Sequence, residues 1–125
     1  MPTILVVDDN DDLRDLATVI IEEMGYTALG APNGDEALRV IESSSGKTID
    51  LLFTDIVMPG RLNGFALARE AKARRPEIKV IYTTGYSNML QQGIEGETFG
   101  PILKKPFRPR VLAEEIRRAL GGVAG

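Results

Sequence analysis

Five short runs of apolar and β-branched residues recur along the chain, each bounded by glycine, proline or acidic residues. Runs this short and this apolar are typical of buried parallel strands. We predict strands at Thr3–Val7, Tyr26–Leu29, Leu51–Asp55, Ile78–Tyr82 and Pro101–Leu103. The second is the weakest of them and closes at Gly30, and the fifth is brief.

Between the predicted strands, apolar residues recur at the spacing of an amphipathic helix. This spacing predicts helices whose apolar residues span Leu13–Met24, Ala37–Ile41, Phe65–Ala71, Ser87–Gln92 and Pro109–Leu120. The second helix follows the turn Asn33-Gly34, and Pro76 stops the third. The fourth has the weakest pattern, since Gly93 and Gly96 follow it and each glycine in a helix costs about 1 kcal/mol relative to alanine. We expect this helix to be short or mobile.

Five strands that alternate with five helices predict one α/β domain built on a parallel sheet. A chain of 125 residues is long enough for one hydrophobic core. We assign residues 1–121 to this domain and expect residues 122–125, which are rich in glycine and alanine, to form a flexible tail.

Composition excludes several classes of function. The chain has 15 Lys and Arg against 18 Asp and Glu, so no basic field is present to attract nucleic acid or anionic lipid. It has no cysteine and no histidine, which excludes disulfides, the usual zinc sites and Ser-His-Asp catalysis. No signal peptide precedes the first strand and no apolar run approaches the length of a membrane span, so we predict a cytoplasmic protein without a membrane partner.

Polar side chains follow four of the predicted strands: Asp8 and Asp9, then Asp55, Thr84 and Lys105. In an open parallel sheet these strand ends lie on one edge, where ligands bind. Asp55 alone could equally cap the next turn, but the other strand ends favour a site. Three carboxylates repel one another unless a cation neutralises them, and oxygen ligands favour Mg²⁺ or Mn²⁺ over Zn²⁺.

Each of these residues also has a structural interpretation. Asp8 and Asp9 could serve the N-terminus of the following helix, but Asn10–Asp12 can do so without them, which favours the metal site. Lys105 taken alone would be a solvated lysine, and Thr84 could equally cap the next helix. No G-x-G-x-x-G motif follows the first strand, so we expect no nucleotide cofactor.

Taken in order, four motifs give the chain a family resemblance: Asp8-Asp9, Thr54-Asp55 followed by Met58-Pro59, Thr84-Gly85 and Lys105-Pro106-Phe107. Over nearly its whole length the chain resembles the receiver domain of two-component response regulators. The resemblance implies a flavodoxin-like three-layer sandwich with strand order 2-1-3-4-5.

The resemblance also implies a function. Asp55 would accept a phosphoryl group from a histidine kinase or phosphotransfer protein, without turnover of a separate substrate. Asp8, Asp9, Asp55 and the backbone carbonyl of Val57 would hold Mg²⁺. Lys105 and Thr84 would contact the phosphoryl oxygens. The face built by the fourth helix, the fifth strand and the last helix would then meet a downstream protein, with homodimerisation on activation left open.

Two features depart from the common pattern. Position 102, often an aromatic residue in receivers, is Ile102, which puts in doubt the usual coupling between the Thr84 shift and an aromatic swing; Tyr82 or Tyr86 could substitute. The loop after Asp55 is one residue longer than the common form and is similar to that of receivers attached to hybrid histidine kinases. The chain would then be one domain of a larger protein.

Two other functions fit parts of the pattern. A pseudo-receiver that acts only as a docking module stays open, although the intact acidic, hydroxyl and lysine positions argue against it. A haloacid-dehalogenase-like phosphohydrolase also uses an aspartate nucleophile, but it needs a second aspartate where this chain has Val57, and it needs a cap segment.

Overall fold

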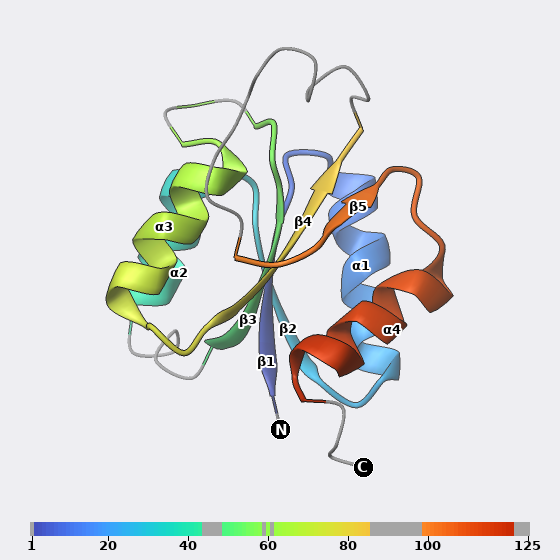
Figure 1. Cartoon of the computed structure of the whole chain (residues 1–125). Coiled ribbons are helices and arrows are strands. Elements are labelled where there is room, and N and C mark those ends of the chain that lie inside the picture. The colour runs from blue at the N-terminus through green and yellow to red at the C-terminus, as the bar shows by residue number, and fades with distance from the viewer. Residues whose placement is uncertain (1, 44–48, 59, 61, 86–98, 122–125) are drawn as a thin grey trace.

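A computed structural model describes residues 2–43, 49–58, 60, 62–85 and 99–121 (Figure 1). Its five strands form one parallel sheet in the order β2-β1-β3-β4-β5, as predicted. They are β1 (Thr3–Val7), β2 (Thr27–Ala31), β3 (Ile49–Asp55), β4 (Lys79–Thr84) and β5 (Ile102–Lys104). The helices within the described residues are α1 (Asp11–Glu23), α2 (Gly34–Glu42), α3 (Gly64–Arg74) and α4 (Pro109–Ala119). The helix predicted at residues 87–92 and the predicted tail at 122–125 lie outside the described residues.

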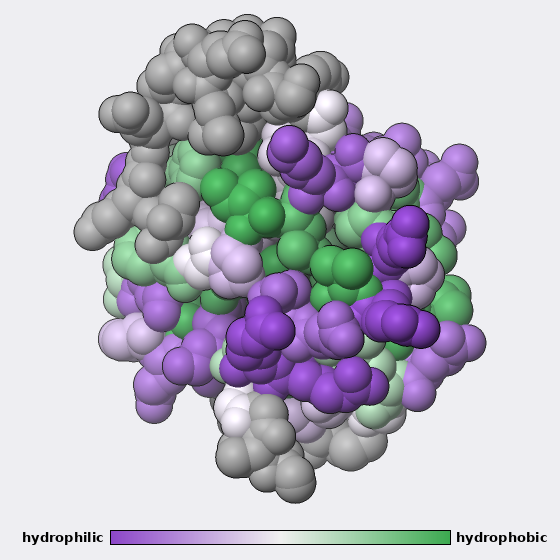
Figure 2. Space-filling view, turned by 45° about the vertical axis from the view of Figure 1, so that its right-hand side comes forward, coloured by the Kyte–Doolittle hydropathy of each residue, from purple (hydrophilic) through white to green (hydrophobic). Residues whose placement is uncertain are grey.

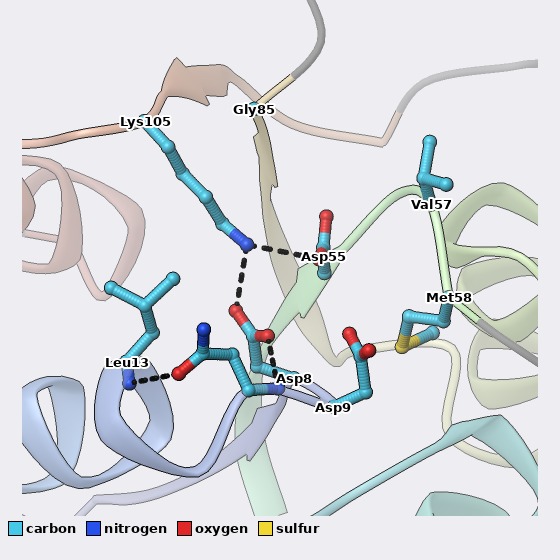
Figure 3. A pocket seen from close by; sticks show the side chains of 9 residues that line it. Asp8, Asp9, Leu13, Asp55, Val57, Met58, Gly85 and Lys105 are labelled. Atoms are coloured by element: carbon cyan, nitrogen blue, oxygen red, sulfur yellow. Dashed lines mark hydrogen bonds and ion pairs between the residues drawn. The ribbon is translucent and has the colours of Figure 1, made fainter.

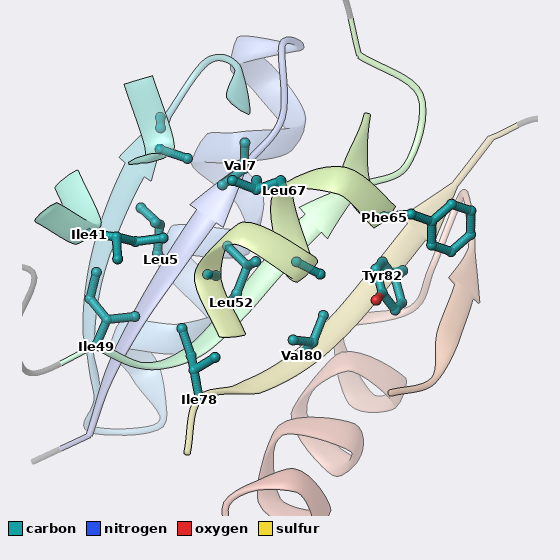
Figure 4. Packing of buried hydrophobic residues seen from close by; sticks show 14 of the residues in the cluster. Leu5, Val7, Ile41, Ile49, Leu52, Phe65, Leu67, Ile78, Val80 and Tyr82 are labelled. Atoms are coloured by element: carbon teal, nitrogen blue, oxygen red, sulfur yellow. The ribbon is translucent and has the colours of Figure 1, made fainter. Parts of the chain in front are cut away.

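The sheet is the middle layer of a three-layer sandwich. Helices α2 and α3 cover one face, and α1 and α4 cover the other (Figure 1). Successive residues of a strand point to opposite faces, so Leu5 and Val7 enter the core beside α2 and α3 while Ile4 and Val6 enter the core beside α1 and α4. Figure 4 shows the first of these cores. The central strands are therefore buried on both faces, which explains their unbroken apolar runs.

Asparagine residues begin three of the described helices. Asn10 accepts a hydrogen bond from the Leu13 N–H at 3.1 Å, and Asn33 and Asn63 cap α2 and α3 in the same way. An N-cap of this kind is worth about 1 kcal/mol, because it satisfies a backbone donor that the helix leaves unpaired. Asn10 therefore caps α1 with its own side chain, while the Asp8 carboxylate accepts from the Asn10 N–H.

Two of the predicted strands end two residues too early. β2 continues through Gly30 to Ala31, because pairing with β1 uses only backbone groups and Gly30 lies opposite Val6. β4 continues to Thr84, which lies opposite Lys104 of β5. Thr84 is thus the last residue of a strand.

Gly64 fixes the loop that follows Asp55. The Gly64 N–H donates to the Ile56 carbonyl at 2.8 Å, so the start of α3 lies directly against the end of β3. A Cβ atom at position 64 would lie 2.7 Å from the Ile56 Cα. Only glycine permits this close approach.

The proposed substitutes for an aromatic at position 102 lie in different situations. Ile102 is 36% exposed on β5. Tyr82 is fully buried, its ring packs on Phe65 with 5.2 Å between centroids, and its hydroxyl accepts from the Phe99 N–H at 3.2 Å. Tyr82 therefore belongs to the core beside α3. Figure 4 shows its ring facing Phe65, which lies on α3. Tyr86 lies outside the described residues.

Candidate functional site

The three predicted acids meet at the carboxyl edge of the sheet. Asp8 directly follows β1, and Asp9 is the residue after it. Asp55 is the last residue of the neighbouring strand β3. One carboxylate oxygen from each lies within 4.8 Å of the others. Asp8 and Asp55 are each 6% exposed, whereas Asp9 is exposed. The strand order alone explains this convergence, since β1 and β3 are adjacent.

Lys105 joins the two buried acids from the other side of the site. Its Nζ lies 2.9 Å from Asp8 Oδ2 and 2.9 Å from Asp55 Oδ2 (Figure 3). Its backbone N–H donates to the Thr84 carbonyl at 2.8 Å, which ties the end of β5 to β4. Lys105 thus offsets part of the charge of two carboxylates that would otherwise repel each other.

These contacts shift the pKa values of the pair. Burial raises the pKa of Asp55, and the hydrogen bond and charge of Lys105 oppose this without cancelling it; the Asp8 charge raises it further. Burial lowers the pKa of Lys105, but hydrogen bonds to Asp8 and Asp55 outweigh burial, so the pKa ends above its ordinary value. Lys105 is therefore firmly cationic, while the Asp55 carboxylate takes up a proton more easily than an exposed aspartate.

A pocket of about 630 Å³ opens onto these groups (Figure 3). It is lined by residues from the ends of four strands and the start of α1: Asp8, Asp9, Asn10, Leu13, Asp55, Val57, Met58, Gly85 and Lys105. Thr84 does not line it; Gly85 does. The structure therefore gathers Asp8, Asp9, Asp55, Val57 and Lys105 in one pocket, whereas Thr84 precedes the lining residue Gly85 in the chain.

Sequence reasoning missed some of the pocket wall. Leu13 was considered only as a helical residue and Met58 only as part of the motif after Asp55, yet both line the pocket, and the Met58 Sδ lies 4.0 Å from the Thr54 hydroxyl. The Lys105–Pro106 peptide bond is cis, for which the sequence holds no signal beyond the proline itself. An apolar side chain beside an acid is ordinarily assigned to the core. Periodicity therefore could not have identified Leu13 and Met58 as pocket residues.

The donor chemistry of the pocket fits a hard divalent cation. The three acids offer only oxygen atoms as ligands, and Val57 lines the same pocket. Mg²⁺ prefers such oxygen ligands, usually one or two carboxylates completed by water. The open pocket leaves room for that water.

Comparison with known proteins gives the family. The family described as response regulator receiver domain matches residues 4–117. The chain belongs to this family. This receiver domain is 32% identical over 121 residues to the response regulator receiver protein CpdR of Brucella abortus, covering 96% of this chain and 98% of CpdR.

The receiver domain is also similar to parts of longer proteins. It is 32% identical over 119 residues to the sensor kinase CckA of Brucella abortus, covering 94% of this chain but only 12% of the kinase. Among solved structures, a response regulator receiver protein from Sinorhizobium medicae has a TM-score of 0.83 at 27% identity, covering 95% of this chain and 94% of that one. The receiver domain of the hybrid histidine kinase CckA has a TM-score of 0.79 at 35% identity, covering 94% and 98%.

None of the helices within the described part of the chain has the length and apolar character needed to cross a bilayer.

Proposed function

We propose that this receiver domain is a phosphoacceptor, in which Asp55 takes a phosphoryl group from the phosphohistidine of a histidine kinase or phosphotransfer protein. The observation that carries the proposal is the Asp55 carboxylate, held at the pocket by Lys105 beside two further acids. A carboxylate nucleophile that forms an aspartyl phosphate is an established covalent strategy. The similarity to the receiver domain of a hybrid histidine kinase supports a partner of this class.

The chemistry requires an anion to approach an anion. An Asp55 carboxylate oxygen attacks phosphorus, a P–O bond forms, and the P–N bond breaks with its electron pair left on the donor imidazole. Asp8, Asp9, Asp55 and the Val57 carbonyl would hold Mg²⁺ or Mn²⁺, which supplies positive charge to the incoming phosphoryl oxygens. Phosphoryl transfer needs mainly positioning and charge neutralisation, and this chain's residues provide both.

Lys105 and Thr84 connect the chemistry to an output. Lys105 exchanges its contact with Asp55 for one with a phosphoryl oxygen, and the Thr84 hydroxyl moves to hydrogen-bond another. Because Thr84 lies opposite Lys104 in the sheet, its movement acts on β5. A coupling of this kind is typically worth about 1 to 3 kcal/mol.

The surface that receives this movement lies beside β5 and α4. Ile102 on β5 and Val111 on α4 are exposed large hydrophobic residues. Figure 2 shows hydrophobic surface among charged groups on the side of the molecule that it brings forward. We propose that this face contacts a downstream protein, and that the domain catalyses only its own phosphorylation and dephosphorylation.

Mass spectrometry tests the phosphoacceptor proposal. A small acyl phosphate donor with Mg²⁺ is expected to add one phosphoryl group to the wild type and none to Asp55→Asn. Asp50→Asn is the matched control, because Asp50 is exposed on the same strand and its carboxylate bonds only the Thr3 N–H among the described residues. A wild type that stays unmodified by a donor shown to be active favours the docking-module function instead.

A further inference from the structure

Asp8 is fixed by four separate contacts. Its N–H donates to the Ala31 carbonyl at 3.2 Å, its Oδ1 accepts from the Asn10 N–H at 2.9 Å, and its Oδ2 lies 2.9 Å from Lys105 Nζ. Its own carbonyl accepts from the Arg14 guanidinium at 2.7 Å. Arg14 reaches the Asp8 carbonyl from the first turn of α1, and phosphotransfer as proposed above does not use it.

Arg14 is itself held in place. On α1 its guanidinium pairs with Asp11 at 2.6 Å, and its side chain is only 21% exposed. Its aliphatic stem passes over Gly30 of β2, where a Cβ atom would lie 3.3 Å from the Arg14 Cδ. The missing side chain at position 30 therefore leaves the space in which the Arg14 stem lies.

The contact with the Asp8 carbonyl controls the next residue. That carbonyl belongs to the peptide plane between Asp8 and Asp9, and a planar peptide fixes the direction in which the Asp9 chain continues. Within the described residues, no hydrogen bond or ion pair holds the exposed Asp9 carboxylate, yet it lies within 4.8 Å of its two neighbours. The placement of Asp9 thus rests on its backbone.

We propose that Arg14 is a positioning residue: by binding the Asp8 carbonyl it orients the Asp8–Asp9 peptide so that both carboxylates face a divalent cation. This inference rests on the Mg²⁺ site of the proposed function. Groups that orient metal ligands typically change metal affinity by about 10- to 100-fold when they are removed.

Calorimetric titration with MgCl₂ tests the inference. Arg14→Met keeps the stem and removes the donors, and its dissociation constant is expected to rise about tenfold or more. Arg14→Lys is expected to recover part of the affinity. Asp11→Asn breaks the ion pair but leaves the carbonyl contact, so its affinity is expected to change about twofold at most. Arg14→Met that binds Mg²⁺ like the wild type overturns the inference.

A second pair of variants separates positioning from general stability. Gly30→Val crowds the Arg14 stem while it favours the strand, so Mg²⁺ affinity is expected to fall without loss of resistance to urea. In the Arg14→Met background the same substitution is expected to leave Mg²⁺ affinity unchanged. Equal weakening in both backgrounds shows that the effect does not run through Arg14 and overturns the inference.

Amide hydrogen exchange measured without metal tests the role of Arg14 separately from the metal site of the proposed function. The Asn10 N–H, which donates to Asp8, is expected to exchange faster in Arg14→Met than in the wild type or in Asp11→Asn. A wild type that binds no Mg²⁺ refutes the metal site of the proposed function and, with it, the role of Arg14 toward a cation. Unchanged Asn10 exchange in Arg14→Met, with Mg²⁺ binding intact in the wild type, refutes the inference alone.

Discussion

Replacing Lys105 with methionine is expected to destabilise the metal-free protein and to make its stability depend strongly on Mg²⁺. The ammonium group lies 2.9 Å from both Asp8 and Asp55, whose side chains are 9% and 8% exposed. Methionine keeps most of the stem and removes the charge. Two nearly buried carboxylates would then face each other without a cation.

The size of the loss follows from the geometry. The two carboxylates have oxygens no more than 4.8 Å apart, so as like charges they repel by at least about 3.5 kcal/mol at an effective dielectric constant of 20 and at least about 0.9 kcal/mol in water. Because the pocket opens to solvent, we expect the free energy of unfolding to fall by about 2 kcal/mol. With a urea m-value of about 2 kcal/mol/M, the midpoint of unfolding falls by about 1 M.

Magnesium should reverse this loss. An ion at 100 times its dissociation constant stabilises the folded state by about 2.7 kcal/mol. In the wild type, an ion held by the acids as proposed would compete with Lys105 for the same oxygens, so Mg²⁺ is expected to stabilise Lys105→Met more than it stabilises the wild type. The assay is urea unfolding followed by far-ultraviolet circular dichroism, in EDTA and in excess MgCl₂.

Lys104→Met is the matched control, since Lys104 is the exposed neighbour on β5. It is expected to change the free energy of unfolding by less than about 0.5 kcal/mol, with the wild-type response to Mg²⁺. If both lysine variants lose the same stability, or if Mg²⁺ stabilises Lys105→Met no more than the wild type, then Lys105 is not what holds the acids together.

Two further predictions concern the same strand end. Gly64→Ala is expected to lower the free energy of unfolding by about 1 to 3 kcal/mol, since its Cβ would lie 2.7 Å from the Ile56 Cα. Gly85→Ala is the control for Gly64→Ala in the same urea titration, because a Cβ atom at position 85 would meet no atom closer than 3.6 Å. If both variants lose the same free energy of unfolding, the close approach at Gly64 is not the cause. Burial raises the pKa of Asp55 above its ordinary value of 3.8, so its ionisation opposes folding at neutral pH. In EDTA, the stability of the wild type relative to Asp55→Asn is expected to rise as the pH falls through the raised pKa and to level off below about 3.8; a difference that is constant with pH refutes the shift.

Much of the fold could be predicted because the central strands are apolar on both faces. A run such as Leu51–Phe53 supplies both cores at once, so its length and position mark a buried strand without ambiguity. The starts of α1 and α2 were equally predictable, since Asn10 and Asn33 precede the predicted helices and cap them. Gly30 misled the prediction because glycine usually ends a strand, whereas here it makes room for Arg14 from another element.

The site was predictable as far as strand order decides it. Asp8, Asp55 and Lys105 follow strands, so a parallel sheet brings them to one edge. Periodicity could not predict which side chains from different helices and strands contact one another. That Tyr82 is enclosed against Phe65, or that Gly85 and not Thr84 lines the pocket, depends on packing across the sheet. A side chain's neighbours from distant parts of the chain leave no pattern in its local sequence.

The acids and the lysine follow strands that differ in their resistance to local unfolding. Asp8 and Asp55 extend from β1 and β3, each bonded to a strand on both sides, whereas Lys105 follows the three-residue strand β5, which borders only β4. Border strands with few backbone bonds open at lower free energy than interior ones. The Lys105 ammonium can therefore move away with β5 while the Asp8 and Asp55 carboxylates keep their places. The arrangement of the acids is then retained after the lysine has left them.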